Sequence, residues 1–350
     1  MINRRELLKF SLLAPFAFYG CKSIDESNKN EIMQIVKPKR IKRGSKIGLI
    51  APGSNTPNPD DINRAIEVLN YYGLSYELAP NITIGMGYKT RTPKERVDDF
   101  NLMFSKSDID AVFCMRGGFG SAQILDLIDY DLIRKNPKIL LGFSDITALH
   151  AGIFKKTGLI TFHGPVMLSK FTDYTIKSFE NIFFKNDEIV LKNPSNKSGF
   201  REEFLTRTII PGKVTGRFVG GNLSLVSSLV GTAYQPDFTD KIVYLEDVGE
   251  TPYRIDRMFL QLKLAGMLDK IKGFVWGKCD DCSVGSSSST WDLSLGEVID
   301  YYIKPLNIPS FTDLMIGHTS NQLTIPNGCM VELDSEISTI KLMESPFIDS

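Results

Sequence analysis

The sequence predicts an α/β protein that begins with a parallel, doubly wound sheet and continues into a second α/β region ending in β-hairpins. Two observations favour the parallel sheet: short apolar runs recur along residues 44–168, and helical patterns separate them. A third is the alternation of apolar and polar residues over 323–342, which is typical of hairpin strands. The 350 residues suffice for two domains. We expect them at 44–168 and 211–345, with a linker region at 169–210.

Five apolar runs predict the strands of the first sheet, at 46–52, 75–78, 111–115, 138–142 and 160–165. Helical spacing of apolar residues predicts helices between these runs, at 60–72, from Pro93, after Ser121 and after Ser144. Thr92, followed by a proline and then by Glu95, forms a capping-box pattern. Ligands bind beyond the carboxyl ends of the strands in such sheets, so residues that follow a strand are the first candidates for a site.

The second half of the chain repeats this pattern with fewer elements. Apolar strands are expected at 241–246 and 271–277, and helices at 252–268 and 293–303. Gly-Gly-Asn at 220–222 leads into a further helical pattern. This region therefore predicts a second α/β domain.

Composition excludes several classes of function. Hydrophobic residues make up 42% of the chain and charged residues 23%, which is ordinary for a globular protein. The formal net charge is +0, and no basic stripe carries interleaved aromatic residues. We therefore expect no nucleic-acid partner. No nucleotide-binding P-loop is present either.

The first 43 residues predict export and a tether. Residues 3–10 resemble a twin-arginine signal, and the apolar stretch 10–20 suits a signal peptide rather than a membrane span. Cys21 follows this stretch in a pattern like a lipoprotein processing site, so we expect a lipid anchor there and a location in the cell envelope or periplasm. The alternatives are an ordinary cleaved signal, an uncleaved anchor and a cytoplasmic protein. We expect contact with a membrane only through this N-terminal segment.

The remaining cysteines leave two interpretations open. Cys114 lies in an apolar strand and is expected in the core. Cys279 and Cys282 have CxxC spacing, for which two structural thiols are the favoured interpretation and a disulfide the second. No second cysteine pair or nearby histidine completes a zinc site, so no metal or other cofactor is expected.

Ser144 stands between an apolar strand and a helical pattern, in Gly-Phe-Ser-Asp-Ile-Thr at 142–147. A serine on a sharp strand-to-helix turn exposes its hydroxyl, and the N–H groups at the helix start point at whatever it attacks. This geometry favours a nucleophile. The alternative is that Ser144 only caps the helix, and the rest of the chain favours the nucleophile over the cap.

A nucleophilic serine needs a base and a carboxylate that orients the base. The chain has three histidines. His318 lies in a polar loop, where a histidine has little role in packing, so it is the predicted base. His163 ends a strand and is the alternative base or a substrate contact, whereas His150 is assigned to surface or packing. Glu246 ends an apolar strand and fits the orienting carboxylate; the alternative is an acid that is merely solvated there.

Two backbone N–H groups are candidates for an oxyanion hole. The N–H of Asp145 directly follows the nucleophile, and the second donor comes from Gly117 or Gly118, where the lack of a side chain allows close approach. The glycine-rich segment 116–121 also suggests a phosphate-binding turn. It lacks the spacing of a dinucleotide fingerprint, so the oxyanion interpretation is favoured.

Six segments together resemble the LD-carboxypeptidase family of serine peptidases. Three carry the proposed groups: Gly-Phe-Ser-Asp-Ile-Thr with Ser144, Leu-Glu-Asp-Val-Gly-Glu with Glu246, and Ile-Gly-His with His318. The other three are Arg-Gly-Gly-Phe-Gly-Ser at 116–121, Gly-Asn-Leu at 221–223 and Tyr-Arg-Ile-Asp-Arg at 253–257. An α/β-hydrolase esterase is disfavoured, because Ile146 stands where the G-x-S-x-G elbow has its last glycine.

The resemblance implies a Rossmann-like N-terminal domain and a C-terminal domain that supplies the glutamate and the histidine. It implies a triad of Ser144, Glu246 and His318, with Asp145 and Gly118 as the oxyanion donors. The implied reaction is hydrolysis of the L,D-peptide bond that releases the terminal D-alanine of murein tetrapeptides, so the expected partner is a muropeptide. Candidate substrate contacts are Arg116, His163, Asn222 and Arg254.

Two rival functions remain at this point. One is a microcin C-type amidase or carboxypeptidase that confers self-immunity, and the other is a non-catalytic envelope protein that binds muropeptides. The sequence leaves the oligomeric state open, with a homodimer as one alternative.

Overall fold

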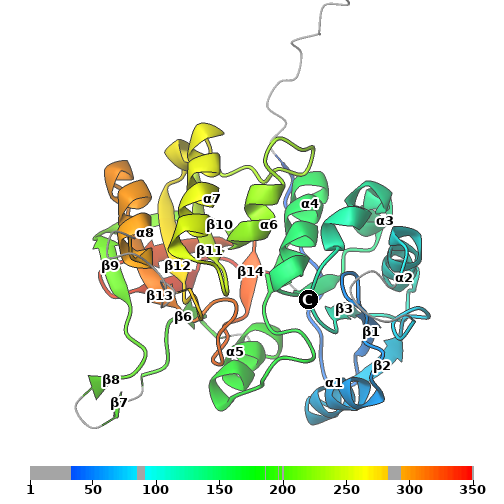
Figure 1. Cartoon of the computed structure of the whole chain (residues 1–350). Helices are drawn as coiled ribbons and strands as arrows, with labels where there is room; N and C mark the ends of the chain where they lie inside the picture. The colour runs from blue at the N-terminus through cyan, green and yellow to red at the C-terminus, as the bar shows by residue number, and fades with distance from the viewer. Residues whose placement is uncertain are drawn as a thin grey trace, which may run out of the picture. The chain divides into compact units, whose positions relative to one another are not determined.

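Two sheets organise the computed structural model of this chain (Figure 1). The first has six strands in the order β14-β5-β4-β3-β1-β2. Its five parallel strands fall in the five predicted apolar runs: β1 (Lys46–Ile50), β2 (Ser75–Leu78), β3 (Ala111–Cys114), β4 (Ile139–Gly142) and β5 (Thr161–His163). The edge strand β14 (Ile325–Asn327) comes from the far end of the chain and pairs antiparallel with β5.

The structure describes residues 33–84, 91–185, 187–195, 197–198, 201–282 and 293–348. All the elements discussed here belong to one compact unit, Gln34–Ser350. The predictions of an export signal and of lipid attachment at Cys21 concern residues outside the described part. Within the described part, no helix combines the length and apolarity that a bilayer crossing requires.

Helices cover both faces of the first sheet. Apolar side chains of α1 (Pro59–Tyr71) and α5 (Asp173–Phe183) share a core with one face of the strands. Those of α2 (Pro93–Ser105), α3 (Tyr130–Lys135) and α4 (Thr147–Thr157) share a core with the other face. The capping box of α2 is present, since Thr92 Oγ1 accepts from Glu95 N at 3.2 Å and Glu95 Oε2 accepts from Thr92 N at 2.8 Å.

The helix expected after Ser121 is a 3₁₀ helix, η1 (Ser121–Leu127). It still buries Ile124 and Leu125, the apolar positions that predicted it. A 3₁₀ helix winds more tightly than an α-helix and is common in short connecting pieces. Apolar spacing over so few residues does not distinguish the two.

The second sheet has eight strands in the order β6-β16-β15-β10-β11-β12-β13-β9. Its parallel centre consists of β10 (Lys213–Asn222), β11 (Lys241–Glu246), β12 (Gly273–Gly277) and β13 (Ser310–Leu314). The antiparallel strands are β15 (Met330–Asp334), β16 (Thr339–Leu342), β6 (Val190–Leu191) and β9 (Arg207–Ile210). The terminal hairpin β15–β16 and the α/β fold class are therefore confirmed.

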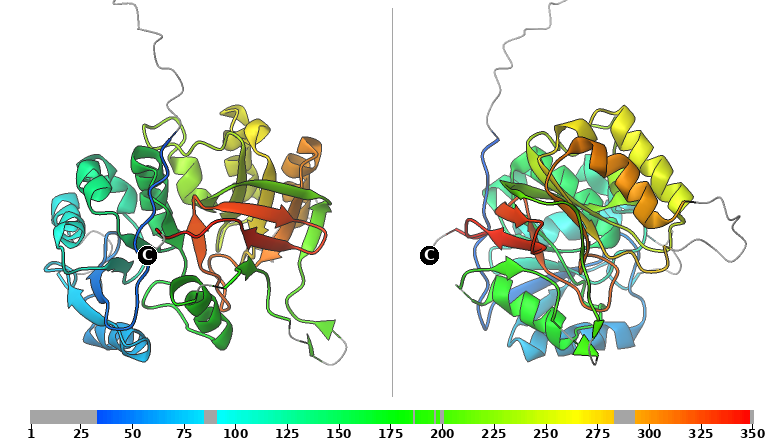
Figure 2. Two further views of the ribbon diagram at one scale, coloured as in Figure 1. Left: turned by 180° about the vertical axis from the view of Figure 1, so that it is seen from behind. Right: turned by 90° about the vertical axis from the view of Figure 1, so that its left-hand side faces the viewer.

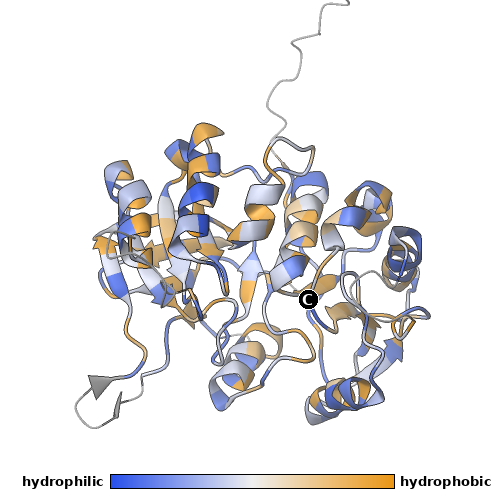
Figure 3. Cartoon of the chain, in the orientation of Figure 1, coloured by the Kyte–Doolittle hydropathy of each residue, from blue (hydrophilic) through white to orange (hydrophobic). Residues whose placement is uncertain are grey.

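Three helices pack on the second sheet and share a core with it: α6 (Leu223–Ser228), α7 (Pro252–Leu264) and α8 (Leu295–Ile303). Figure 2 shows α7 and α8 on the face of this sheet that is turned away from the viewer in its left-hand view, where the terminal strands β15 and β16 lie in front. Hydrophobic and hydrophilic stretches alternate along α7 in Figure 3, as an amphipathic helix requires. The remaining short elements are β7 (Lys197–Ser198), β8 (Arg201–Glu202), η3 (Leu268–Lys270) and η4 (Lys304–Leu306).

A buried hydrogen bond from backbone to side chain joins the two sheets beside the first residues of α4. The N–H of Asn222, the last residue of β10, donates to Thr147 Oγ1 at 3.0 Å. Thr147 begins α4 three residues after Ser144. The carboxyl end of the second sheet therefore meets the strand-to-helix turn of the first.

Candidate active site

Ser144 begins η2 (Ser144–Ile146), directly after β4 and the connecting residue Phe143. Its φ of 64° lies in the left-handed region, which residues other than glycine rarely adopt. Gly117 lies directly behind it, where a Cβ atom would come within 2.9 Å of Ser144 Cβ. Ser144 is partly exposed. The turn therefore holds the hydroxyl in a strained position that a substrate can reach, as is common at functional sites.

His318 connects Ser144 to Glu246. Its Nε2 lies 3.0 Å from Ser144 Oγ, and its Nδ1 lies 2.8 Å from Glu246 Oε2. An ionised carboxylate only accepts hydrogen bonds, so Nδ1 carries the proton and donates it to Glu246. The lone pair of Nε2 then faces the serine hydroxyl. The structure thus brings together the three predicted catalytic residues in an arrangement able to remove the serine proton.

Glu246 is enclosed by the protein. It ends β11 with no exposed surface, and a Cβ atom at Gly317 would overlap its Oε2. Gly317 has φ 84° and directly precedes His318, so a glycine here allows the histidine loop to lie against the carboxylate. Within the described part of the chain, Oε1 has no hydrogen-bond partner, so His318 is the one group that Glu246 holds.

The environment of His318 raises the pKa of its imidazole above the ordinary value of 6.5. Burial is the largest single influence and by itself lowers the pKa. The hydrogen bond and the negative charge of Glu246 act in the opposite direction, and the charges of Asp247 and Asp280 add to them. As a result, the ring keeps its proton to a higher pH than a free histidine does.

This shift predicts a loss of activity in acid. A protonated His318 cannot accept the proton of Ser144, so hydrolysis should fall as the pH drops through the raised pKa and level off above it. The measurement is kcat/KM between pH 5 and pH 9, which reports groups of the free enzyme. An acid limb centred above pH 6.5 is expected; activity that rises as the pH is lowered would contradict this role.

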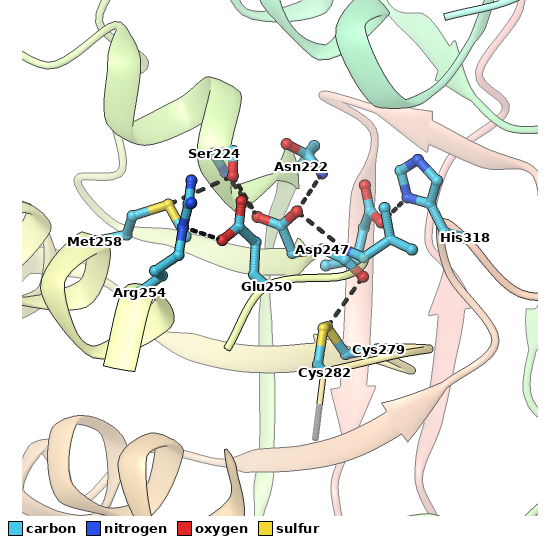
Figure 4. The surroundings of a disulfide bond; sticks show 11 residues. Asn222, Ser224, Asp247, Glu250, Arg254, Met258, Cys279, Cys282 and His318 are labelled. Atoms are coloured by element: carbon cyan, nitrogen blue, oxygen red, sulfur yellow. Dashed lines mark hydrogen bonds and ion pairs between the residues drawn. A yellow bond between two sulfur atoms is a disulfide. The ribbon is translucent and has the colours of Figure 1, made fainter. Parts of the chain in front are cut away.

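Asp247 anchors the turn that follows Glu246 (Figure 4). Its Oδ1 accepts from Asn222 Nδ2 at 3.0 Å and from Val248 N at 2.9 Å. Its Oδ2 accepts from the N–H and the hydroxyl of Ser224 at 2.9 and 2.8 Å. Successive side chains of an extended chain point to opposite faces. Glu246 therefore faces His318, whereas Asp247 stabilises the backbone on the other side.

Asn222 was a candidate substrate contact, but its side chain is occupied by the scaffold. Besides holding Asp247, its Oδ1 accepts from Leu225 N at 3.2 Å and caps α6. It is 3% exposed. In this conformation the structure therefore gives Asn222 a structural role.

His163 is placed in the core and not at the surface of the site. It has no exposed surface, and its ring packs 6.2 Å from that of Phe143 and 5.4 Å from that of Tyr244. Burial, helped by the neighbouring His150 and His318, holds its pKa well below 6.5, so it is neutral. His150 is also buried, with Nε2 2.8 Å from the carbonyl oxygen of Gly142, in agreement with the packing assignment.

The two candidate arginines differ in their surroundings. Arg254 pairs with Glu250, with Nε 2.5 Å from Oε2, and Figure 4 shows this pair beyond Asp247 as seen from His318. Arg116 is exposed, and the described residues offer it no ion-pair partner. It directly precedes Gly117, which packs behind Ser144. Arg116 is therefore the better placed of the two to meet a substrate.

Cys279 and Cys282 form a disulfide, with Cα atoms 5.6 Å apart, so the favoured interpretation of two thiols was wrong. Cys279 Sγ lies 3.0 Å from the carbonyl oxygen of Asp247, and the bond thus packs under the turn after Glu246 (Figure 4). Cys114 and Cys329 are buried free thiols. No group of three potential metal ligands is found among the residues that the structure describes.

Sequence reasoning missed two charged side chains beside the nucleophile. The carboxylate of Asp145 accepts from Ser121 N at 2.8 Å, and buried Arg96 donates to the carbonyl oxygen of Gly120 at 2.7 Å. A charged residue inside a helix that is otherwise apolar on that face, as Arg96 is beside Val97 and Phe100, was the available signal. The predicted roles of Asp145 N–H and Gly118 N–H as oxyanion donors stay predictions.

Comparison with known proteins gives the class of protein that this fold and site define. Residues 47–164 match the family model of the LD-carboxypeptidase N-terminal domain, and residues 215–333 match that of the C-terminal domain. The chain belongs to the LD-carboxypeptidase family of peptidases.

Several relatives carry more specific names. A Bacillus subtilis protein named "Probable murein peptide carboxypeptidase" is 37% identical over 311 residues, which is 87% of this chain and 93% of that protein. The "Microcin C7 self-immunity protein MccF" of Escherichia coli is 32% identical over 73% of this chain and 80% of its own length. The "Murein tetrapeptide carboxypeptidase" of Pseudomonas aeruginosa is 27% identical over 81% of this chain and 91% of its own length.

Solved structures show the same fold. MccF in complex with glutamyl sulfamoyl guanosine matches with a TM-score of 0.79 at 27% identity, over 89% of this chain and 99% of that one. The muramoyltetrapeptide carboxypeptidase of Oxalobacter formigenes matches with a TM-score of 0.72 at 26% identity, over 85% and 98%.

Proposed function

We propose that this protein is a serine carboxypeptidase that removes the terminal D-alanine from murein tetrapeptides by cutting the L,D-peptide bond. The observation that carries the proposal is the hydrogen-bonded series from Ser144 Oγ through His318 to Glu246. Membership of the LD-carboxypeptidase family and relatives named as murein peptide carboxypeptidases support the substrate class.

In the first step, Ser144 Oγ attacks the carbonyl carbon of the scissile bond while its proton passes to His318 Nε2. The resulting oxyanion accepts hydrogen bonds from the N–H groups of Asp145 and Gly118. His318 then gives the proton to the departing amine of D-alanine, which leaves an ester on Ser144. A water molecule attacks the ester, again with His318 as base, and releases the shortened peptide.

Recognition of a carboxypeptidase substrate requires a group that binds the free terminal carboxylate. We assign this to Arg116, because a guanidinium binds a carboxylate through two parallel hydrogen bonds. Its exposed side chain directly precedes Gly117, the residue that packs behind the nucleophile. The buried position of His163 makes it a packing residue in this scheme.

The test is incubation of the purified protein with a defined murein tetrapeptide. Mass spectrometry should detect free D-alanine and the tripeptide, and a matched tetrapeptide that ends in L-alanine should remain intact. EDTA should not change the rate. Absence of D-alanine release from the folded wild-type protein would refute the proposal.

The similarity to MccF supports one rival, an amidase acting on a peptide–nucleotide antibiotic of the microcin C type. Turnover of an aminoacyl nucleotide in parallel with the murein tetrapeptide separates the two substrates. A serine-reactive phosphonate addresses the other rival, the non-catalytic binding protein. A catalyst should be labelled at Ser144, whereas a binding protein would leave it unmodified.

A further inference from the structure

The segment 116–121, which we name the glycine loop, lies directly against the nucleophile. A Cβ atom at Gly117 would lie 2.9 Å from Ser144 Cβ and 3.2 Å from the carbonyl oxygen of Phe143. The loop connects β3 to η1 and contains Gly118, the predicted oxyanion donor. A loop rich in glycine is pliable, so its backbone must be held from outside if one N–H is to keep a fixed direction.

Asp145 holds the loop from the side of the nucleophile. Its Oδ1 accepts from Gly120 N at 3.2 Å, and its Oδ2 accepts from Ser121 N at 2.8 Å. The side chain is buried, with 2% exposure. The residue that follows the nucleophile therefore fixes the end of the glycine loop through two hydrogen bonds to an ionised group, which are stronger than neutral ones.

Arg96 holds the same loop from α2. Its Nη1 donates to the carbonyl oxygens of Gly120 and Pro52 at 2.7 and 2.8 Å, and its Nη2 donates to Gln123 Oε1 at 2.7 Å. Gly120 is thus bound at its N–H by Asp145 and at its carbonyl by Arg96. Gly120 has φ 120°, and a Cβ atom there would lie 2.6 Å from Arg96 Nη1, so this close approach requires glycine.

We propose that Asp145 and Arg96 are positioning residues that hold the glycine loop against Ser144, so that the N–H of Gly118 faces the developing oxyanion. This inference rests on the proposed serine mechanism and names two residues that the triad does not include. Neither side chain touches the substrate. Both bind the backbone of Gly120, and Asp145 also binds the N–H of Ser121.

Removing the negative charge of Asp145 should change the reaction rate in a direction that distinguishes loop positioning from direct electrostatic repulsion. Asp145 is a negative charge close to the place where the oxyanion forms, and by Coulomb repulsion alone its removal should speed the reaction. If its carboxylate positions the loop, the same removal should slow the reaction instead. The variant Asp145→Asn is therefore expected to move the rate in opposite directions under the two explanations.

The experiment compares Asp145→Asn and Arg96→Lys with the wild-type protein. Lysine keeps the positive charge of Arg96 but not the fork of donors that reaches Gly120, Pro52 and Gln123. We expect kcat to fall about 100-fold in each variant, as when one oxyanion donor is lost, while KM changes little. The rate at which a phosphonate labels Ser144 should fall in parallel.

The control is Asp334→Asn, which alters a buried carboxylate that accepts from Glu336 N at 3.1 Å and pairs with Lys213 in the second sheet. It should lower thermal stability without changing kcat. Folded variants with kcat within twofold of wild type, or a faster Asp145→Asn enzyme, would overturn the inference. If Asp145→Asn does not fold, the kcat of Arg96→Lys alone decides whether the inference stands.

Tetrapeptide hydrolysis and phosphonate labelling of Ser144 distinguish failure of the proposed function from failure of this inference. If the wild-type protein does not hydrolyse murein tetrapeptide, the proposed function fails. The labelling rate of Ser144 still measures the oxyanion site in that case, because the phosphonate reacts at tetrahedral phosphorus, whose polar phosphoryl oxygen requires the same hydrogen-bond donors as the oxyanion, without needing the natural substrate.

Discussion

Replacing Ser144 with alanine should abolish D-alanine release, with kcat lower by about 10⁶-fold, the loss seen when the nucleophile of a serine peptidase is removed. The reason is that His318 Nε2, 3.0 Å from Ser144 Oγ, would have no hydroxyl to activate. The measurement is single-substrate turnover of the tetrapeptide with mass spectrometric detection. Thermal unfolding should change little, since the alanine keeps the backbone of the turn.

A matched control for this variant is Ser105→Ala, at an exposed position at the end of α2 where the hydroxyl donates to Leu102 O within the same helix. Its kcat should equal that of the wild-type protein. Substantial turnover by Ser144→Ala would remove Ser144 from the mechanism. Retained binding of the intact tetrapeptide by Ser144→Ala would show that the loss is chemical.

The second large effect is expected for Glu246→Gln, with kcat lower by about 10⁴-fold, the loss typical of an orienting carboxylate in a triad. Glutamine keeps the shape of the buried side chain but removes the charge that stabilises the protonated His318. Since burial is the largest influence that lowers the pKa of His318, removing the charge should also move the acid limb of kcat/KM to lower pH.

Glu344→Gln is the control for this variant, because Glu344 pairs with Lys37 and Arg217 in a different part of the molecule. It should leave both the rate and the pH profile unchanged. A Glu246→Gln enzyme whose acid limb stays in place would show that the carboxylate does not set the pKa of His318.

The strand ends beside the candidate site could be predicted from sequence, while the catalytic roles assigned to the residues there stay predictions. Ser144 and Glu246 each follow or close an apolar run, and such runs identify the strand and the edge at which its last residue emerges. His318 was found by elimination, because the chain has three histidines and its polar loop offered no packing role. These inferences depend only on the local pattern of apolar and polar residues in the sequence.

The surroundings of His163, Asn222 and the cysteine pair could not be predicted from sequence, because they depend on contacts between distant segments. His163 ends a strand at the correct edge, yet the ring of Tyr244 from the second sheet packs against it and β14, from residues 325–327, pairs with its strand. Asn222 was drawn into the scaffold by Asp247, a neighbour only after β10 and β11 pair. The disulfide likewise depends on how the loop after β12 folds.

The nucleophile and its activating groups come from different sheets, and this arrangement bears on when the enzyme becomes active during synthesis. Ser144 emerges early with the first sheet, but Glu246 and His318 are translated later, and β14, which completes the first sheet, follows His318. A chain released before residue 318 would carry an unactivated hydroxyl. Under the proposed mechanism, hydrolytic activity would therefore require the chain to be complete through His318 and both sheets to have folded.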